Sequence, residues 1–319
     1  MNILITGVAG FIGFNFASNL LKANKNIKIV GIDIINSYYS VKLKKKRINS
    51  LNKNKNFKFF KIDLKNKKGL EIIFKKYKFS KVYNFAAQAG VRYSIKHPSK
   101  YQESNIEGFF NILEFSRLYK VQELFYASSS SVYGESKNFP LQETEKTEPK
   151  NFYGLTKKIN EQMAENYSKN YKMSITGLRF FTVYGEWGRP DMSIFKIIDC
   201  SFRKKIFYLN NFGNHDRDFT YIKDVTNSIL KLKCKKEMHQ IYNVCSNKPI
   251  NLKKLLIIIS KFIALPKIIK RPMQKADVKK THGSNLKILK NTNFKKYTNL
   301  KTGLGNTINW YKNYFKINI

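Results

Sequence analysis

A glycine-rich turn near the N-terminus constrains the fold of this chain more than any other feature. The apolar run at 2–6 predicts a strand, Gly7, Gly10 and Gly13 follow at G-x-x-G-x-x-G spacing, and helical periodicity begins directly after them. Glycines let a pyrophosphate approach the backbone N–H groups at the start of a helix. A second strand ends at Asp33, twenty residues after Gly13, where a carboxylate can bind adenosine ribose hydroxyls. This unit predicts dinucleotide binding, and because Asp33 repels a 2′-phosphate it favours NAD over NADP.

A Tyr-x-x-x-Lys motif at Tyr153 and Lys157 is the candidate for chemistry. The residues after it, KINEQMAENY, are typical of a helix, so the two side chains stand at i and i+4 on one helix face. A lysine ammonium near a phenol stabilises the phenolate, and we expect it to lower the pKa of Tyr153 from about 10 toward neutrality. Tyr153 is then a candidate general acid/base near pH 7, although the same spacing also occurs on ordinary surface helices.

Strands alternate with helices through the first half of the chain. This alternation predicts an α/β fold, a Rossmann-type doubly wound parallel sheet, with a smaller mixed α/β substrate-binding region. Ligands in such sheets lie at the carboxyl ends of the strands. The expected strands cover 2–6, 27–33, 57–63, 81–89, 123–134 and 174–185, and a long helix is expected over 99–118.

The division of the chain follows from the same alternation. We expect an NAD-binding Rossmann domain over 1–180, with 219–262 packing back on it, and a substrate-binding region over 181–319. No internal repeat or low-complexity linker interrupts the sequence.

The charge balance is strongly basic, with 60 Lys and Arg against 21 Asp and Glu and a net charge of +39. Such a balance attracts nucleic acid or an anionic membrane surface. The lysines are spread along the chain rather than gathered in one block, so we expect no nucleic-acid partner and no membrane partner. A basic surface still helps to collect a polyanionic small substrate.

Cysteine and histidine usage points to the cytoplasm and to a site without metal. The three cysteines form no C-x-x-C pair and the four histidines are scattered, which fits a reducing compartment and predicts no metal site. No apolar run approaches the roughly 18 residues that a membrane helix needs. The opening MNILITG lacks a basic segment and predicts a strand rather than a signal peptide.

Five segments together resemble the extended short-chain dehydrogenase/reductase family of nucleotide-sugar enzymes, and most of all its UDP-glucuronate 4-epimerases. They are NFAAQAGVRYSIKHP, YASSSSVYG, YGLTKK, LRFFTVYGEWGRPDM and DRDFTYIKDV, and the resemblance runs from Met1 to about Tyr314. It implies that Tyr153 is the catalytic tyrosine, Lys157 its partner and Ser129 the catalytic serine. Ser130 stays a reserve because the four-serine run allows a shift of one residue.

The resemblance also implies the contacts with cofactor and substrate. Phe181 matches a position that lines the nicotinamide, Arg217 one that contacts the phosphates, and Thr182 and Arg189 positions that hold a sugar carboxylate. The alternative for Arg189 is a salt bridge with Asp191 in its own loop. The implied NAD contacts are Gly7, Gly10, Phe11, Ile12, Gly13, Asp33, Asp63, Leu64, Ala86, Ala87, Gln88, Asn105, Ser128, Tyr153, Lys157 and Phe181, and those to the UDP-sugar are Arg92, Ser129, Ser130, Thr182, Arg189, Arg217 and Asp277.

The implied activity is an NAD-dependent interconversion of UDP-glucuronate and UDP-galacturonate through a 4-keto intermediate. One alternative is a 4-epimerase of a UDP-glucose or UDP-N-acetylglucosamine type of substrate, which needs no buried cation such as Arg189. A dehydratase or decarboxylase is disfavoured because Ser130 and Ser131 stand where those enzymes place an acid. A nucleic-acid or anionic-surface binding protein on this fold is the alternative outside the enzyme class. Members of the family are commonly homodimers, so the same assembly is open to this chain.

Overall fold

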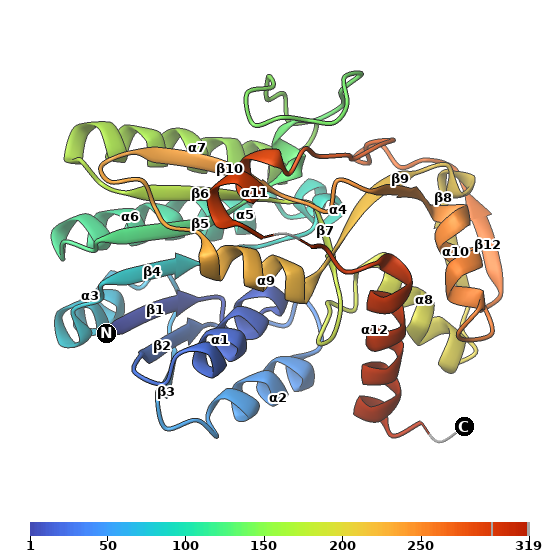
Figure 1. Cartoon of the computed structure of the whole chain (residues 1–319), viewed down its shortest axis with the longest axis horizontal. Coiled ribbons are helices and arrows are strands. Elements are labelled where there is room, and N and C mark those ends of the chain that lie inside the picture. Colours follow the sequence, from blue (N-terminus) through green and yellow to red (C-terminus); the bar gives the residue numbers. More distant parts are fainter. Residues whose placement is uncertain (295, 318–319) are drawn as a thin grey trace.

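The main sheet of the computed structural model, which describes residues 1–294 and 296–317, has seven parallel strands in the order β10-β6-β5-β4-β1-β2-β3 (Figure 1). The order reverses beside β1, which pairs with β2 on one side and β4 on the other, as in a doubly wound fold. The strands are β1 (Asn2–Thr6), β2 (Lys28–Asp33), β3 (Phe57–Lys61), β4 (Lys81–Asn84), β5 (Glu123–Ser129), β6 (Ile175–Phe180) and β10 (His239–Val244).

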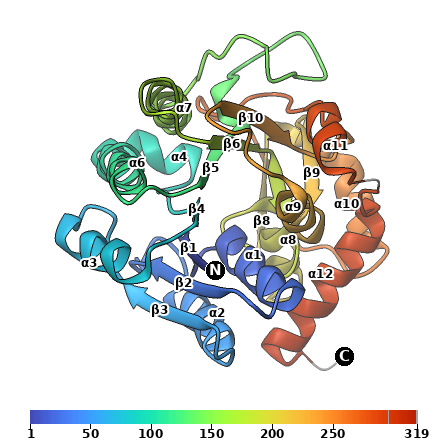
Figure 2. The same cartoon turned by 60° about the vertical axis from the view of Figure 1, so that its left-hand side comes forward.

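Helices cover both faces of this sheet, which is why its strands are nearly continuous apolar runs. On β1, Ile3 and Ile5 pack into one core and Leu4 into the other. Figure 2 shows α1, α2 and α9 on one side of the sheet and α3, α6 and α7 on the opposite side. These helices are α1 (Phe11–Ala23), α2 (Val41–Leu51), α3 (Lys67–Tyr77), α6 (Gly108–Leu118), α7 (Phe152–Tyr171) and α9 (Ile222–Lys231).

A second group of elements lies beyond the carboxyl ends of the main strands. A three-stranded sheet has the order β11-β9-β7, and β12 pairs in parallel with β8. The chain then returns to the main sheet, since β10 pairs with β6. The division into domains stays a prediction. The remaining elements are β7 (Thr182–Tyr184), β8 (Phe207–Asn210), β9 (Asp216–Tyr221), β11 (Pro249–Asn251), β12 (Ile268–Arg271), α4 (Val91–Lys96), α5 (Pro98–Tyr101), α8 (Ser193–Phe202), α10 (Leu252–Ser260), α11 (Leu286–Thr292), α12 (Leu300–Phe315), the π-helical η1 (Gln102–Glu107) and the 3₁₀ turns η2 (Ser130–Val132) and η3 (Asn211–Gly213).

Several expected elements differ from what the structure has; the strands expected over 57–63 and 123–134, for example, end at Lys61 and Ser129. The strand expected over 81–89 ends at Asn84, because the following backbone leaves the sheet and Ala86 N–H donates to Thr6 Oγ1 at 3.0 Å. The run expected over 174–185 is divided between β6 and β7, which belong to different sheets. The helix expected over 99–118 contains the π-helical segment η1. Each break lies beside the cavity described below.

Across the described residues, every helix is too short or too polar to span a membrane.

Candidate active site

A cavity of about 840 Å³ opens at the carboxyl ends of the main strands. The glycine turn and the ends of β2, β3, β4 and β5 form one part of its wall, and β7, β8 and the loop before α8 form the other. The structure does not bring Asn105 to this wall. Asn105 is buried behind it, where its amide bonds Gln88 N–H and C=O and Thr156 Oγ1. The predicted residues that do line the cavity are Gly7, Gly10, Phe11, Ile12, Gly13, Asp33, Asp63, Leu64, Ala86, Ala87, Gln88, Arg92, Ser128, Ser129, Ser130, Tyr153, Lys157, Phe181, Thr182, Arg189, Arg217 and Asp277.

The glycine turn has the shape that a pyrophosphate requires. Gly7 has a φ of +66°, and a Cβ at Gly13 would lie 2.4 Å from the Gly7 carbonyl oxygen, so the turn cannot close with side chains in these places. Helix α1 starts at Phe11 after Gly10, which supplies no side-chain cap. The N–H groups of its first turn are therefore available to an anion, and the positive end of the helix dipole faces it.

Asp33 stands at the end of β2 beside this turn. Its carboxylate accepts hydrogen bonds from Ala9 N at 3.0 Å and Ile35 N at 2.8 Å. Burial raises the pKa of Asp33 above its usual value, while these two hydrogen bonds and the nearby Lys44 oppose the shift. Each oxygen retains a lone pair toward the cavity, so the turn and Asp33 together fit the pyrophosphate and ribose of a dinucleotide.

Tyr153 and Ser129 are brought together where α7 begins against the end of β5. The side chain of Asn151 caps α7 by accepting from Gly154 N at 2.9 Å, and a Cβ at Gly154 would lie 2.5 Å from the Ser131 carbonyl oxygen. This close approach brings the phenol of Tyr153 beside Ser129, whose hydroxyl lowers the pKa of the phenol. The neighbouring Ser128 is engaged elsewhere, because its hydroxyl donates to Glu161 Oε1 at 2.6 Å.

Lys157 does not have the effect on Tyr153 that the motif predicts. Its Nζ donates to the carbonyl of Ala127 at 2.9 Å, and its side chain is buried. Burial raises the pKa of Tyr153, and the hydroxyl of Ser129 and the charge of Arg189 oppose this shift. Burial also lowers the pKa of Lys157 to about 7, opposed by Glu161. The expectation that Lys157 brings the phenol toward neutrality is therefore wrong for the chain alone, because desolvation dominates both groups.

Arg189 lines the cavity and is also paired within its own loop. Its Nε and Nη2 donate to the two carboxylate oxygens of Asp191, and Tyr38 OH donates to the same carboxylate at 3.2 Å. Both the cavity position and the salt bridge foreseen as its alternative are thus present. Because Asp191 takes Nε and one N–H of Nη2, both N–H groups of Nη1 and the second N–H of Nη2 are left for a ligand.

The other predicted substrate residues form a second charged group. Arg92 pairs with Asp277 through two hydrogen bonds, of 3.3 and 2.7 Å. Arg217 donates to the carbonyls of Asp216, Val278 and Lys279, and burial lowers its pKa to about 10, still far above neutral pH. The cavity therefore carries fixed positive charge at this end.

The sequence analysis missed a set of hydrogen bonds made by Lys44 and Arg47 of α2, which connect separate parts of the cavity wall. Arg47 is fully buried and donates to the carbonyls of Ala9, Trp187 and Gly188 and to Tyr39 OH, so it ties the glycine turn to the loop of Arg189. Lys44 donates to Asn36 at the cavity wall. The signal was available, because Lys44 and Arg47 alternate with Leu43, Ile48 and Leu51 on the buried face of α2.

Comparisons with known proteins place this geometry in a family. The family model for GDP-mannose 4,6 dehydratase matches residues 4–307. The chain belongs to this family. It is 40% identical over 338 residues to Protein CapI of Staphylococcus aureus, covering 99% of this chain and 100% of that protein. A UDP-glucuronate 4-epimerase of Thermodesulfobacterium geofontis is 39% identical, with 97% of this chain and 95% of that protein covered.

A solved structure of the same family has the same fold. The crystal structure of UDP-glucuronic acid 4-epimerase from Bacillus cereus in complex with UDP-glucuronic acid and NAD matches with a TM-score of 0.92 and 29% identity, covering 98% of this chain and 100% of that one. The predicted resemblance to extended short-chain dehydrogenase/reductases and the Rossmann-type fold class are confirmed.

Proposed function

We propose that the protein is an NAD-dependent 4-epimerase that interconverts UDP-glucuronate and UDP-galacturonate. The observation that carries the proposal is that Tyr153 and Ser129 line one cavity together with a dinucleotide turn and the half-buried cation Arg189. The relatives from Thermodesulfobacterium geofontis and Bacillus cereus, matched over nearly their whole length, bear the name of this activity.

The side chains divide the chemistry at C4 of the sugar among them. NAD⁺, when bound, supplies a hydride acceptor that returns the hydride in each turnover. Tyr153, as phenolate, takes the proton of the 4-hydroxyl, and Ser129 donates a hydrogen bond to the charge developing on O4. Lys157, when protonated, stabilises the phenolate. The 4-keto sugar then turns about its phosphate linkage, so that the opposite face of C4 receives the returning hydride, and Tyr153 returns the proton to O4.

A glucuronate substrate must be held so that its carboxylate is retained. A C4 ketone makes the sugar a β-keto acid, which loses CO₂ when the carboxylate bond stands perpendicular to the carbonyl plane. We assign this restraint to Arg189 through Nη1 and to Thr182 at the start of β7. A guanidinium holds a carboxylate in a defined orientation, which a single-point ammonium does not.

The acids in the cavity wall support epimerisation over dehydration. Elimination of water needs an acid or base that is free to reach C5 or C6. Among the described residues that line the cavity, the carboxylates are Asp33, Asp63, Asp191 and Asp277. Asp33 and Asp63 accept from backbone N–H groups, Asp191 pairs with Arg189 and Asp277 with Arg92. The positions after Ser129 are serines, so no carboxylate in this set serves as that acid.

The test is incubation of the purified protein with UDP-glucuronate, followed by NMR of the sugar anomeric protons. The expected result is growth of the UDP-galacturonate signal to equilibrium without added cofactor. UDP-glucose and UDP-N-acetylglucosamine run in parallel address the alternative substrates. Faster conversion of either neutral sugar would replace the proposed substrate, and conversion of none would reject the epimerase.

We also propose that the protein forms a homodimer through α6 and α7. An aromatic cluster bridges these two helices at the surface, with Phe110 and Tyr171 exposed and Tyr167 between them. A second copy can cover this face by two-fold pairing of the same helices. Light scattering of Phe110→Glu checks the proposal, since the variant should elute as a monomer while the unchanged chain elutes at twice its mass.

A cytoplasmic location is the compartment proposed for this activity. The three cysteines are unpaired in the structure, which suits a reducing environment. Cell fractionation with an antibody against the chain tests the location, and recovery outside the cytoplasmic fraction would contradict it.

A further inference from the structure

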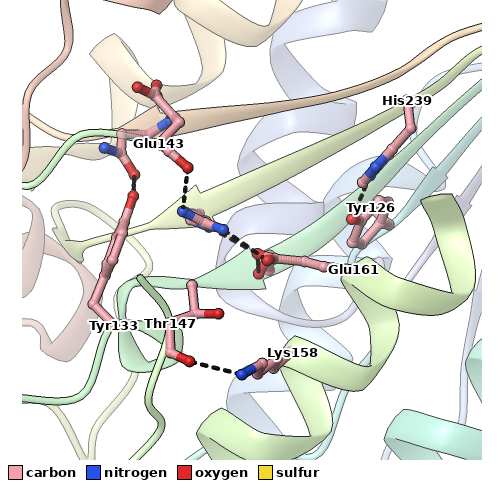
Figure 3. Close-up of polar contacts among 10 residues, drawn as sticks. Tyr126, Tyr133, Glu143, Thr147, Lys158, Glu161 and His239 are labelled. Atoms are coloured by element: carbon pink, nitrogen blue, oxygen red, sulfur yellow. Dashed lines mark hydrogen bonds and ion pairs between the residues drawn. The ribbon is translucent and has the colours of Figure 1, made fainter. Parts of the chain in front are cut away.

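A buried polar network extends from the catalytic end of α7 into the sheet (Figure 3). At its centre Glu161, which is 6% exposed, receives two hydrogen bonds of 2.8 Å from Arg179 on β6. The same carboxylate receives the 2.6 Å hydrogen bond of Ser128, the residue before Ser129. Arg179 also donates to the Glu143 carbonyl at 3.2 Å and stacks over the ring of Tyr133 at 4.6 Å. None of these contacts belongs to the cofactor or substrate wall except that of Ser128.

Glu161 is placed to act on the catalytic lysine. Tyr153, Lys157 and Glu161 follow one another at i, i+4 and i+8, so they share one face of α7. The lysine is 3% exposed and has no carboxylate in hydrogen-bond contact, only the Ala127 carbonyl. A buried ammonium in this situation loses its proton readily, and Glu161 is the charge that raises the pKa of Lys157 against burial.

We propose that Glu161 is a positioning residue that keeps Lys157 protonated at neutral pH and fixes the strand end that carries Ser129. The proposal deepens the function given above and rests on it. Arg179 supports Glu161, because its two parallel hydrogen bonds hold the carboxylate in one orientation. Through Ser128 the same carboxylate holds the end of β5, and with it Ser129, which lies beside Tyr153.

The other titratable groups near Glu161 do not replace it. Tyr126 on β5 and His239 on β10 lie close and bond each other at 2.9 Å. Burial raises the pKa of Tyr126 well above its ordinary value and lowers that of His239 to about 4, so both are neutral at pH 7. Glu165, one turn further along α7, bonds Lys169 at the surface. Glu161 and Arg179 form the buried salt bridge of the network.

The decisive variant is Glu161→Gln, which keeps shape and a hydrogen-bond acceptor for Ser128 but removes the charge. Lysine labelled at Cε, with the Lys157 signal assigned from its absence in Lys157→Met, reports the titration of Lys157 by NMR without any substrate. We expect the titration midpoint of Lys157 to fall by roughly one pH unit or more in the variant. We also expect the alkaline limb of the kcat profile with UDP-glucuronate to move to lower pH by a similar amount.

Two further variants keep the result interpretable. Glu161→Gln leaves Arg179 unpaired and can fail to fold, so Glu161→Gln/Arg179→Met is measured beside it. Its midpoint should also fall, but by less, because losing the Arg179 charge offsets part of the change. Glu161→Asp restores the charge and should return the midpoint toward that of the unchanged protein. Asp224→Asn is the matched control, because Asp224 on α9 is a buried carboxylate that accepts two hydrogen bonds from Thr298 and lies outside the cavity wall. It should lower stability and leave the Lys157 midpoint in place.

The outcomes separate this inference from the proposed function. An unchanged Lys157 midpoint in both charge-removing variants overturns the role of Glu161, whatever the enzyme acts on. A midpoint that falls equally in Asp224→Asn overturns it too, because the effect would then be general loosening. A protein that fails to convert UDP-glucuronate but shows the lowered midpoint rejects the proposed substrate and retains the effect of Glu161 on Lys157.

Discussion

Replacing Lys157 with methionine should stabilise the cofactor-free protein most at low pH. The side chain is 3% exposed, and burial lowers its pKa from 10.5 to about 7. Because the folded-state pKa lies below the unfolded-state value, the unfolded chain binds more protons between these two pH values. The free energy of unfolding of the unchanged protein therefore rises with pH across this window, and the penalty of burying Lys157 is fully present below pH 7.

The size of the effect follows from the same two pKa values. A shift of 10.5 to about 7 corresponds to about 5 kcal/mol in total. Between pH 6 and pH 9 the proton linkage relation gives a change of about 3 kcal/mol for this one group. Lys157→Met removes the titration and fills the same volume with an uncharged chain. Its stability advantage over the unchanged protein should therefore shrink by that amount as the pH rises from 6 to 9.

The assay is urea unfolding of both proteins, stripped of cofactor, at several pH values from 6 to 9. Taking the difference between the two proteins at each pH cancels the titration of all other groups. Lys158→Met, on the same helix, controls for the loss of one positive charge. A difference that stays constant or grows with pH would refute the reasoning, because Lys157 would then not be the buried titrating group that the structure makes it.

Three further outcomes follow from the site. Protein denatured after purification should release NAD, identified by mass. Release of NADP alone would contradict the prediction that Asp33 selects NAD over NADP. Tyr153→Phe should lower kcat by about 10² to 10⁴-fold with UDP-sugar binding retained in calorimetry, because only the proton-transfer group is lost; turnover within tenfold of the unchanged enzyme would assign the base elsewhere. Arg189→Ala should weaken UDP-glucuronate binding by about 1.5–3 kcal/mol and release a UDP-4-keto-pentose with reduced cofactor, seen by mass spectrometry and NADH absorbance. Arg189→Lys should restore binding and carboxylate retention only in part. If Arg189→Ala epimerises at the wild-type rate and forms no pentose, Arg189 does not hold the carboxylate.

The parts of the fold that the sequence predicts are those fixed by local periodicity. The strand, glycine turn and helix of residues 2–23 are local, and the sterics of Gly7 and Gly13 allow few alternatives. The capping side chain of Asn151 likewise places Tyr153 in the first turn of α7. Where long-range contacts decide, the prediction fails. The end of β4 depends on Thr6 and the π-helical turn on contacts of Asn105 with Gln88, neither of which leaves a mark in a local pattern.

The same distinction between local patterns and long-range contacts applies to the candidate site. Tyr153, Lys157 and Asp33 were predicted from residue types at fixed spacing, because their proposed roles place them at the end of a strand or the start of a helix. Arg47 escaped notice because a buried arginine bonded to carbonyls has no charged partner whose position the sequence would suggest. The protonation of Tyr153 and Lys157 was misjudged for a related reason. Spacing gives the distance between two groups, whereas desolvation depends on everything packed around them.

The position of Arg189 joins substrate choice to the protonation of Tyr153. Its charge lowers the pKa of the phenol, so it favours the phenolate as well as a bound carboxylate. Asp191 accepts from two of its nitrogens, Nε and Nη2, and is itself held by Tyr38, so Nη1 is left for a ligand. A glucuronate carboxylate on that nitrogen cancels part of the field that Tyr153 feels, whereas a neutral sugar does not. An enzyme that acts on the acidic sugar therefore depends more on Lys157 for its phenolate, and a lysine buried beside Glu161 is the group that must remain protonated for turnover.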